Sequence, residues 1–436
     1  MKLLVQNGRL VDPANNIDAL KDIFVADGKI LAVTDPGSRV ADFTADRTID
    51  ADSLMVSPGF VDLAARLREP GYEYRATLES EMNAAMHGGV TSLVCPPDTD
   101  PVLDEPGLVE MLKYRARSLN QAHVYPLGAL TVGLKGEVLT EMTELTEAGC
   151  IGFSQASEPI RNTERLMHAL QYAKTYDYCV WLHPQDAWLG RSGIAHSGPV
   201  ATRLGLSGVP YITETVALYQ LFELVRHTGA RLHLCRLSSA KGVELVRQAK
   251  KEGLPITCDV SAHHVHLTEN DIDFFDSNAK VLPPFRATID RDAISAGLTD
   301  GTIDAICSDH TPVDDDEKLL PFGEAAPGAT GLELLLPLTL RWAQQQSHPD
   351  GAEYLHAIAK ITSEPARILR INCGALTPGM PADICIFDPM ARWIVDPTRF
   401  ASQGRHTPFT GKELTGMVMM TVVEGRIAFA REPFLR

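Results

Sequence analysis

The sequence lacks the features that mark several specialised protein classes. It has no run of about 18 apolar residues, the length that a membrane-spanning helix needs. The first residues, Met-Lys-Leu-Leu-Val-Gln-Asn-Gly, do not have the apolar stretch of a secretory signal. Basic residues are outnumbered 40 to 56, and a formal charge of −16 argues against nucleic acid or an anionic membrane as the main partner. We therefore expect a cytoplasmic protein.

Paired cysteines are also absent. The 8 cysteines form no Cys-x-x-Cys motif and are scattered, mostly in apolar surroundings. This distribution predicts reduced, buried thiols and not a disulfide framework. What remains is an ordinary globular composition with 44% hydrophobic and 22% charged residues. At 436 residues the chain is long enough for a (β/α)8 barrel and a small second domain.

Both ends of the chain are rich in short strands. Residues 22–33 form two apolar runs joined at Asp27-Gly28, and residues 417–429 repeat this pattern around Glu424-Gly425. Such pairs tolerate the positive φ of tight hairpin turns. Neither end can bury an apolar face alone. The simplest architecture therefore pairs both ends in one small β-domain, made of residues 1–56 and 375–436.

The middle of the chain alternates strand-like and helix-like segments, which is typical of a parallel α/β fold. Counting apolar runs gives eight candidate strands, which predicts a (β/α)8 TIM barrel over residues 57–374 with its chemistry at the C-terminal strand ends. The candidates are residues 60–67, 90–94, 123–127, 150–154, 179–183, 231–235, 256–260 and 303–309.

Residues 57–71 carry the most specific motif, Ser-Pro-Gly-Phe-Val-Asp-Leu-Ala-Ala-Arg-Leu-Arg-Glu-Pro-Gly. This segment resembles the first barrel strand of the cyclic amidohydrolases, and of the dihydroorotases above all. In that family the middle reads Asp-Leu-His-x-His-Leu-Arg-Glu-Pro-Gly, and the two histidines bind zinc. Ala64 and Arg66 stand at these two positions. Matches continue to residues 407–411, and the resemblance implies a metal-dependent hydrolase barrel with both chain ends in the β-domain.

The same resemblance identifies the other former metal positions. The bridging aspartate is replaced by Gln155 and a histidine by Arg236, whereas His183 and Asp309 are retained, Asp309 at the position of the general base. Methyl and guanidinium groups offer no lone pair, and a neutral amide is a poor bridge between two cations. A catalytic zinc usually has three protein ligands. We therefore predict that zinc is absent and that His183 and Asp309 are vestigial.

The arginines suggest what replaces the metal. A buried Asp309 without a metal needs a partner, so we expect Arg66 or Arg236 to pair with it. Arg68 matches the family arginine that binds the substrate carboxylate, and Asp98 replaces an asparagine of the same site. The simplest expectation is that these vestigial substrate positions, Arg68 and Asp98, bind each other.

The resemblance thus implies a non-catalytic dihydroorotase-like subunit. Inactive homologues of this kind assemble with bacterial aspartate transcarbamoylase in pyrimidine biosynthesis, so we expect a homo-oligomer or hetero-oligomer. Two alternatives stay open. One is a weakly active, metal-poor cyclic amidohydrolase that uses Asp309 and His183. The other is a small-anion sensor whose pocket is formed by Arg66, Arg68 and Arg236.

Overall fold

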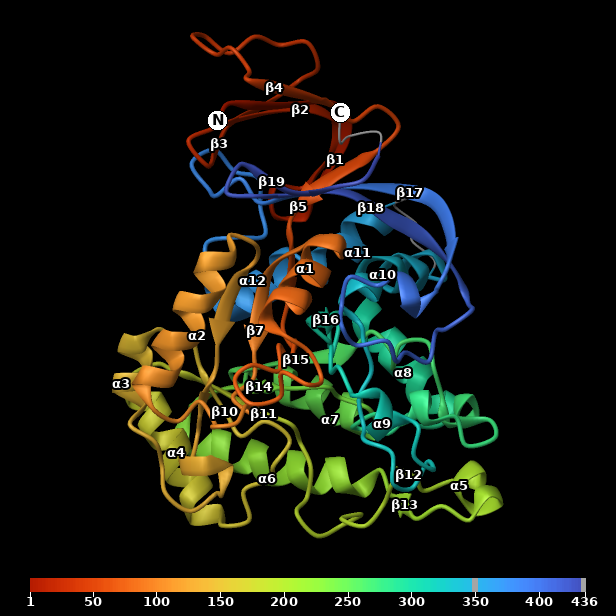
Figure 1. Cartoon of the computed structure of the whole chain (residues 1–436). Helices are drawn as coiled ribbons and strands as arrows, with labels where there is room; N and C mark the ends of the chain where they lie inside the picture. Colours follow the sequence, from red (N-terminus) through yellow and green to blue (C-terminus); the bar gives the residue numbers. More distant parts are fainter. Residues whose placement is uncertain (347–351, 433–436) are drawn as a thin grey trace.

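The computed structural model describes residues 1–346 and 352–432 and shows a β-sheet domain above a barrel (Figure 1). Strands from both chain ends form one 8-stranded sheet in the order β19-β18-β17-β5-β1-β2-β3, with β4 paired to β1. The strands are β1 Leu3–Asp12, β2 Ile17–Ala26, β3 Lys29–Thr34, β4 Arg47–Asp50, β5 Met55–Pro58, β17 Ile384–Ile394, β18 Glu413–Val423 and β19 Arg426–Ala430.

Both predicted hairpins are confirmed in this sheet. Asp27 and Gly28 connect β2 to β3 with φ of 51° and 76°, and Glu424 and Gly425 connect β18 to β19 with φ of 46° and 71°. Residues from both ends share one apolar core, which explains why neither end needs to bury its face alone. This core includes Leu3, Val5, Ile23, Ile384, Met420 and Val422. The domain boundaries at residues 56 and 375 stay a prediction.

The predicted TIM barrel is confirmed. Its parallel strands pair in sequence order, and an isolated bridge between Ala65 and His310 joins the first strand region to the last. The barrel strands are β6 Phe60–Asp62, β7 Val90–Cys95, β8 His123–Pro126 with its continuation β9 Gly128–Ala129, β10 Phe153–Ser154, β11 Cys179–Leu182, β14 Arg231–Leu234, β15 Ile256–Ser261 and β16 Ala305–Cys307.

The first barrel strand is shorter than its sequence suggests. We predicted residues 60–67, but regular strand ends at Asp62. The Asp62 carboxylate, fully buried, accepts the backbone N–H groups of Ala64 at 3.4 Å and Ser308 at 2.8 Å. These bonds draw the following residues out of the strand path, so Ala64 and Arg66 stand on irregular chain at the barrel mouth.

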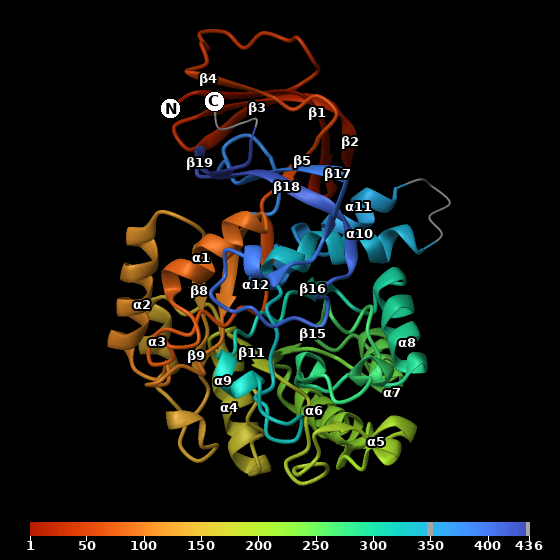
Figure 2. The same cartoon turned by 45° about the vertical axis from the view of Figure 1, so that its right-hand side comes forward.

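Helices surround the barrel and pack on its apolar core (Figures 1 and 2). The first, α1, begins after Thr77, whose side chain accepts from the N–H of Ser80. The helices are α1 Leu78–His87, α2 Pro106–Leu119, α3 Met142–Ala148, α4 Thr163–Thr175, α5 Pro199–Leu204, α6 Ile212–Thr228, α7 Ala240–Lys251, α8 Thr288–Thr299, α9 Asp315–Lys318, α10 Leu335–Gln344, α11 Glu353–Ala359 and α12 Ser363–Leu369; the two-residue strands β12 Ala195–His196 and β13 Gly208–Val209 lie beside α5.

Two further expectations concern single features. All 8 cysteines are unpaired, and their side chains are buried or half-buried, as the sequence predicts. Among the residues that the structure describes, no helix is long and apolar enough to cross a bilayer.

Candidate functional site

Two arginines and an aspartate meet at the C-terminal ends of the barrel strands, where a TIM barrel carries its chemistry. Arg66 follows β6, Arg236 follows β14 and Asp309 follows β16. Arg236 Nη1 lies 3.3 Å from Oδ1 of Asp309, and Arg66 Nη1 lies 3.7 Å from the same oxygen. The three side chains are only 6 to 9% exposed. The expected pairing of Asp309 with an arginine is therefore present, and both guanidiniums take part.

A serine and a second aspartate extend this cluster. Arg66 donates through Nε to Asp98 at 2.7 Å. The Ser157 hydroxyl accepts from Arg236 at 3.0 Å and from Arg66 at 3.4 Å, so one oxygen lies between two guanidiniums. We call Arg66, Asp98, Ser157, Arg236 and Asp309 the arginine cluster. Its cations and carboxylates alternate, which compensates their charges in a site where Arg66, Arg236 and Asp309 are buried and Asp98 is 27% exposed.

The backbone holds this cluster in an unusual conformation. Arg236 and Asp309 have φ of 57° and 49°, in the left-handed region that residues with a Cβ seldom adopt. The buried Asp259 carboxylate stabilises the first of these by accepting the Arg236 N–H at 2.6 Å. Arg236 also donates through Nη1 to the carbonyl of Leu282 at 3.1 Å. The Arg236 side chain is thus held at both ends, by the bond of its backbone N–H to Asp259 and by the bond of its guanidinium to Leu282 O.

Burial and charge act against each other on the two carboxyl groups. Burial raises the pKa of Asp309 above its usual value, and the guanidiniums of Arg236 and Arg66 oppose that rise. Burial also acts to raise the pKa of Asp98, but Arg66, with smaller contributions from Arg68 and Arg236, outweighs it and holds that pKa below its usual value. Asp98 is therefore the more firmly ionised of the two. Removing an arginine from this cluster would leave a buried negative charge without compensation.

The predicted pairing of Arg68 with Asp98 is wrong. Asp98 accepts from Arg66, whereas Arg68 donates through Nε to the carbonyl of Pro312 at 2.9 Å. No described residue forms a carboxylate ion pair with Arg68, and burial, with the nearby charge of Arg66, lowers its pKa to about 10. Arg68 lines a cavity of about 220 Å³ together with the arginine cluster and His263.

Gln155 and Ala64 do not take part in the cluster. The Gln155 side chain accepts from Thr131 at 2.9 Å and donates to the carbonyl of Leu134 at 2.7 Å, so both ends of its amide are used. It is 1% exposed. Ala64 offers no side-chain donor or acceptor, and its carbonyl accepts the N–H of His310 at 3.1 Å. Both residues have become part of the scaffold around the mouth.

His183 keeps an imidazole at the end of β11. Its Nδ1 lies 3.2 Å from the carbonyl of Cys235, which can only accept, so Nδ1 carries the proton and Nε2 has a free lone pair. Burial, followed by the charge of Arg236, lowers its pKa to about 3. The ring is therefore neutral at pH 7. In charge state it could serve as a metal ligand.

Comparisons with known proteins match the chain over nearly its whole length. The model described as dihydro-orotase-like matches residues 53–242, and that of the amidohydrolase family matches residues 186–429. A dihydroorotase-like protein of Pseudomonas putida is 41% identical, over 99% of this chain and 100% of that protein. A dihydroorotase of Syntrophus aciditrophicus is 39% identical over the same shares of the two chains.

The chain belongs to the dihydroorotase-like amidohydrolases. Among solved structures, the L-hydantoinase (dihydropyrimidinase) of Arthrobacter aurescens superposes with a TM-score of 0.85 over 98% of this chain and 96% of that one. A D-hydantoinase superposes with a TM-score of 0.83 over 99% and 96%. Sequence identities of 24% and 19% make these likenesses of fold. They agree with a barrel joined to a β-domain.

Amidohydrolases are typically metal-dependent, but the residues of this dihydroorotase-like chain do not fit a zinc pair. Of the six positions that the family resemblance assigns to metal, only His183 and Asp309 carry a histidine or a carboxylate, and Asp309 Oδ1 is bound by arginine. Two cationic side chains stand among the remaining positions, where a divalent cation would be repelled. One imidazole and one occupied carboxylate fall short of the three protein ligands that catalytic zinc usually has.

One other group in the described residues has metal-ligating side chains close together. Ligand atoms of His233, Cys235 and Asp259 lie within 4.8 Å of one another. The two ring nitrogens of His233 are already used, by Thr257 at 2.8 Å and Asp259 at 3.0 Å. Asp259 also holds the Arg236 N–H. This buried group therefore supports the arginine cluster from behind and is not an open metal site.

Sequence reasoning missed two hydroxyl residues of the site. Ser157 accepts from both arginines, and Thr311 accepts from Arg66 Nη1 at 3.1 Å. Each lies two residues beyond a position that the sequence did single out, Gln155 and Asp309. That closeness was the available signal, but serine and threonine are too common in loops to be recognised without the arginines in place.

Proposed function

We propose that this chain is a cytoplasmic, non-catalytic dihydroorotase-like protein. The observation that carries the proposal is the arginine cluster, in which Arg236 and Arg66 bind Asp309 where the family mechanism needs metal. The family mechanism relies on metal to lower the pKa of a bound water and to polarise the amide, and the described donor set at this mouth does not fit that metal. His183 is neutral, and Asp309 is engaged by two cations. The buried charges of the arginine cluster compensate one another without a metal.

We further propose that the chain is a structural partner of aspartate transcarbamoylase in pyrimidine biosynthesis. The partner comes from the family resemblance alone. An assembly role agrees with a barrel mouth that carries ion pairs at the positions assigned to metal, because such a role needs the folded framework and not the metal.

Purified protein tests the first half of the proposal. We expect no stoichiometric zinc and no dihydroorotate turnover. Stoichiometric metal together with turnover would overturn it. The second half is tested by separating the chain from a co-purifying transcarbamoylase and following that enzyme. We expect the separated enzyme to lose activity and to form a smaller oligomer, and unchanged activity and size would refute the assembly role.

A second candidate is a weakly active, metal-poor dihydroorotase. The names of relatives support it, since proteins of Syntrophotalea carbinolica and Geobacter metallireducens, each 39% identical over 98 to 99% of this chain, are called dihydroorotases. On this alternative Asp309 acts as general base. Asp309→Asn would abolish turnover, whereas Asp300→Asn, an exposed change, would not. Turnover that survives Asp309→Asn would point to a contaminating enzyme.

A small-anion sensor is the remaining candidate. Its support is the cavity of about 220 Å³ in which Arg68 has no carboxylate partner. Orotate or carbamoyl aspartate should then raise the melting temperature of the wild type, and not that of Arg68→Gln. No shift with either compound would remove this candidate.

A further inference from the structure

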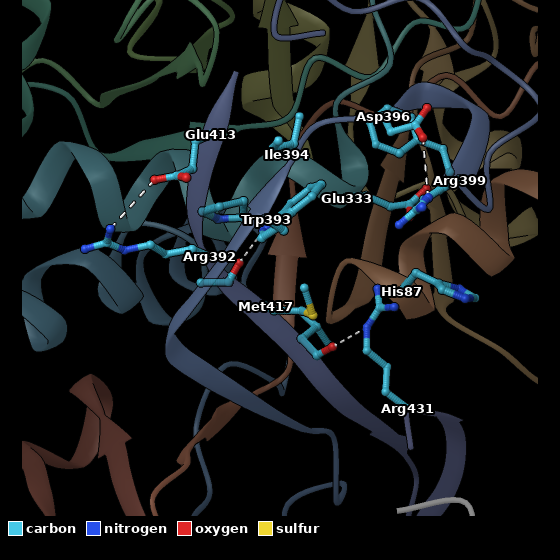
Figure 3. Close-up of a pocket in the computed structure, with 14 residues that line it drawn as sticks. His87, Glu333, Arg392, Trp393, Ile394, Asp396, Arg399, Glu413, Met417 and Arg431 are labelled. Carbon is cyan, nitrogen blue, oxygen red and sulfur yellow. Dashed lines mark hydrogen bonds and ion pairs between the residues drawn. The ribbon is translucent and has the colours of Figure 1, made fainter. Parts of the chain in front are cut away.

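A larger cavity, of about 750 Å³, lies away from the barrel mouth, beneath the outer halves of β17 and β18 (Figure 3). Its walls come from the end of α1, the start of α10 and these two strands, and we call it the arm cavity. Its volume is within the range of about 300–1,000 Å³ typical of small-molecule sites.

The long strands β17 and β18 create the space. Only Ile384 to Phe387 of β17 pair with β5, and the register between β17 and β18 shifts between Asp388 and Arg392. Beyond this point the two strands leave the sheet and pass along α10 (Figure 2). Gly416 permits their close approach, because a Cβ there would lie 2.8 Å from Cδ1 of Leu340. The outer parts of β17 and β18 thus form an arm, and the cavity lies between this arm and the barrel.

Arg431 brings a positive charge to this cavity. Its backbone N–H donates to Met419 O at 2.8 Å, its Nε donates to Val418 O at 2.9 Å, and its guanidinium lies 5.3 Å from the Phe429 ring. These contacts fix the group, and its Nη donors form no hydrogen bond with any residue that the structure describes. No described residue forms a carboxylate ion pair with Arg431, and burial lowers its pKa. The other arginines of the cavity are paired, Arg399 with Asp396 at 3.4 Å and Arg392 with Glu413 at 3.9 Å.

Glu333 and His87 do not prevent an anion from binding in the arm cavity. Glu333 Oε1 accepts the N–H groups of Ala401 at 2.8 Å and Ser402 at 3.3 Å, and burial raises the pKa of this carboxyl to about 7. A partly protonated Glu333 repels an incoming carboxylate only weakly and can donate to it. His87 is held by the carbonyl of Asn83 at 2.9 Å, and burial lowers its pKa. Glu333 and Arg431 attract each other at a distance, each acting on the pKa of the other, but they form no ion pair or hydrogen bond among the described contacts.

The remaining wall is apolar and includes aromatic rings. The Trp393 indole N–H donates to Gly416 O at 2.9 Å, which fixes the ring, and Phe400, Pro337 and Met417 also line the cavity. We propose that the arm cavity binds a small organic carboxylate, with its carboxylate on Arg431 and its flat apolar body against Trp393 and Phe400. The proposal is independent of the assembly role. It concerns a site about 3 times the volume of the barrel-mouth cavity, 750 against 220 Å³.

Indole-3-acetate is a suitable probe, and indole-3-acetamide is its uncharged control. We expect calorimetry on the full chain to show saturable binding of one indole-3-acetate per chain. An arginine–carboxylate bond typically contributes enough for roughly a tenfold change in affinity or more. The amide should therefore bind at least roughly tenfold more weakly, and Arg431→Gln should weaken indole-3-acetate by a similar factor.

Matched variants separate this site from others. Arg203→Gln removes an exposed arginine on α5 and should leave binding unchanged, whereas Arg431→Lys keeps the charge and should lose less affinity than Arg431→Gln. Trp393→Leu should weaken acetate and amide alike. Three results would overturn the proposal: no saturable binding in the millimolar range, equal binding of acid and amide, or loss of binding in Arg68→Gln with full retention in Arg431→Gln.

Discussion

Replacing Arg236 by methionine tests whether the arginine cluster stabilises the fold in place of metal. The substitution keeps a long apolar stem and removes the guanidinium that lies 3.3 Å from Asp309. It also removes the bonds to Leu282 O and Ser157 Oγ. Asp309 would then retain only Arg66, at 3.7 Å.

The expected loss follows from burial. Breaking a buried ion pair by removing one partner typically costs about 3–5 kcal/mol. Arg66 offsets part of this loss, so we expect Arg236→Met to lower the free energy of unfolding by ~3 kcal/mol. Adding Asp309→Asn removes the uncompensated charge, and the double variant should therefore recover ~1–2 kcal/mol of that loss.

The loss should depend on pH in a defined direction. Burial raises the folded-state pKa of Asp309, and removing Arg236 raises it further. A carboxyl group with a raised folded-state pKa contributes its stability fully below the unfolded pKa of about 4 and loses it as pH rises through the folded pKa. The difference between wild type and Arg236→Met should thus be smaller at pH 5 than at pH 8.

Urea unfolding followed by circular dichroism measures these differences, with an unchanged slope as the check on comparability. Arg226→Met is the matched control. Arg226 binds two carboxylates, Glu252 at 2.8 Å and Glu223 at 3.1 Å, but unlike Arg236 its side chain is 42% exposed. Exposed pairs contribute about 0–1 kcal/mol. If Arg236→Met costs no more than Arg226→Met, or if Asp309→Asn gives no recovery, the cluster does not stabilise the barrel as argued.

Three further predictions address other parts of the chain. Burial raises the pKa of Glu333 to about 7, so its stabilising contribution is complete below pH ~4.5 and is lost as pH rises through 7. Glu333→Gln should remove ~2 kcal/mol of this dependence in urea midpoints at pH 5 and pH 8, and parallel curves for both proteins would contradict it. Restoring Ala64→His, Arg66→His and Arg236→His together with Gln155→Asp should give zinc that survives dialysis, measured by mass spectrometry; unchanged metal content would argue against these as the former ligand positions. Gly71→Ala should cost ~2 kcal/mol or more, because φ is 96° and its Cβ would lie 2.0 Å from Asp100 O, whereas Gly253→Ala, with φ of 82° and open space, should cost ~1 kcal/mol in the same urea assay.

The sequence predicts the fold well because its signals are periodic and local. Hairpin pairs such as Asp27-Gly28 and the eight apolar runs correspond to elements of the structure. The first strand was predicted too long because its end depends on Asp62 accepting from Ser308, 246 positions later in the chain. Such a contact has no signature near residue 62. Local patterns therefore predict which strands exist, but long-range polar contacts decide where they end.

At the candidate site, the sequence likewise does not predict which partner each side chain contacts. The family resemblance predicts that Arg66, Gln155 and Arg236 replace metal ligands, and charge alone predicts that an arginine binds Asp309. Gln155 instead turns to Thr131 and Leu134, because a neutral amide is satisfied by any donor and acceptor nearby. Arg68 was paired with the wrong carboxylate for a related reason: Arg66 can reach Asp98 and Asp309 at once, which leaves Arg68 to Pro312. Charge determines which kinds of group must pair in a buried site. Which particular residues pair depends on the distances between their side chains, and these distances are set by the folded chain.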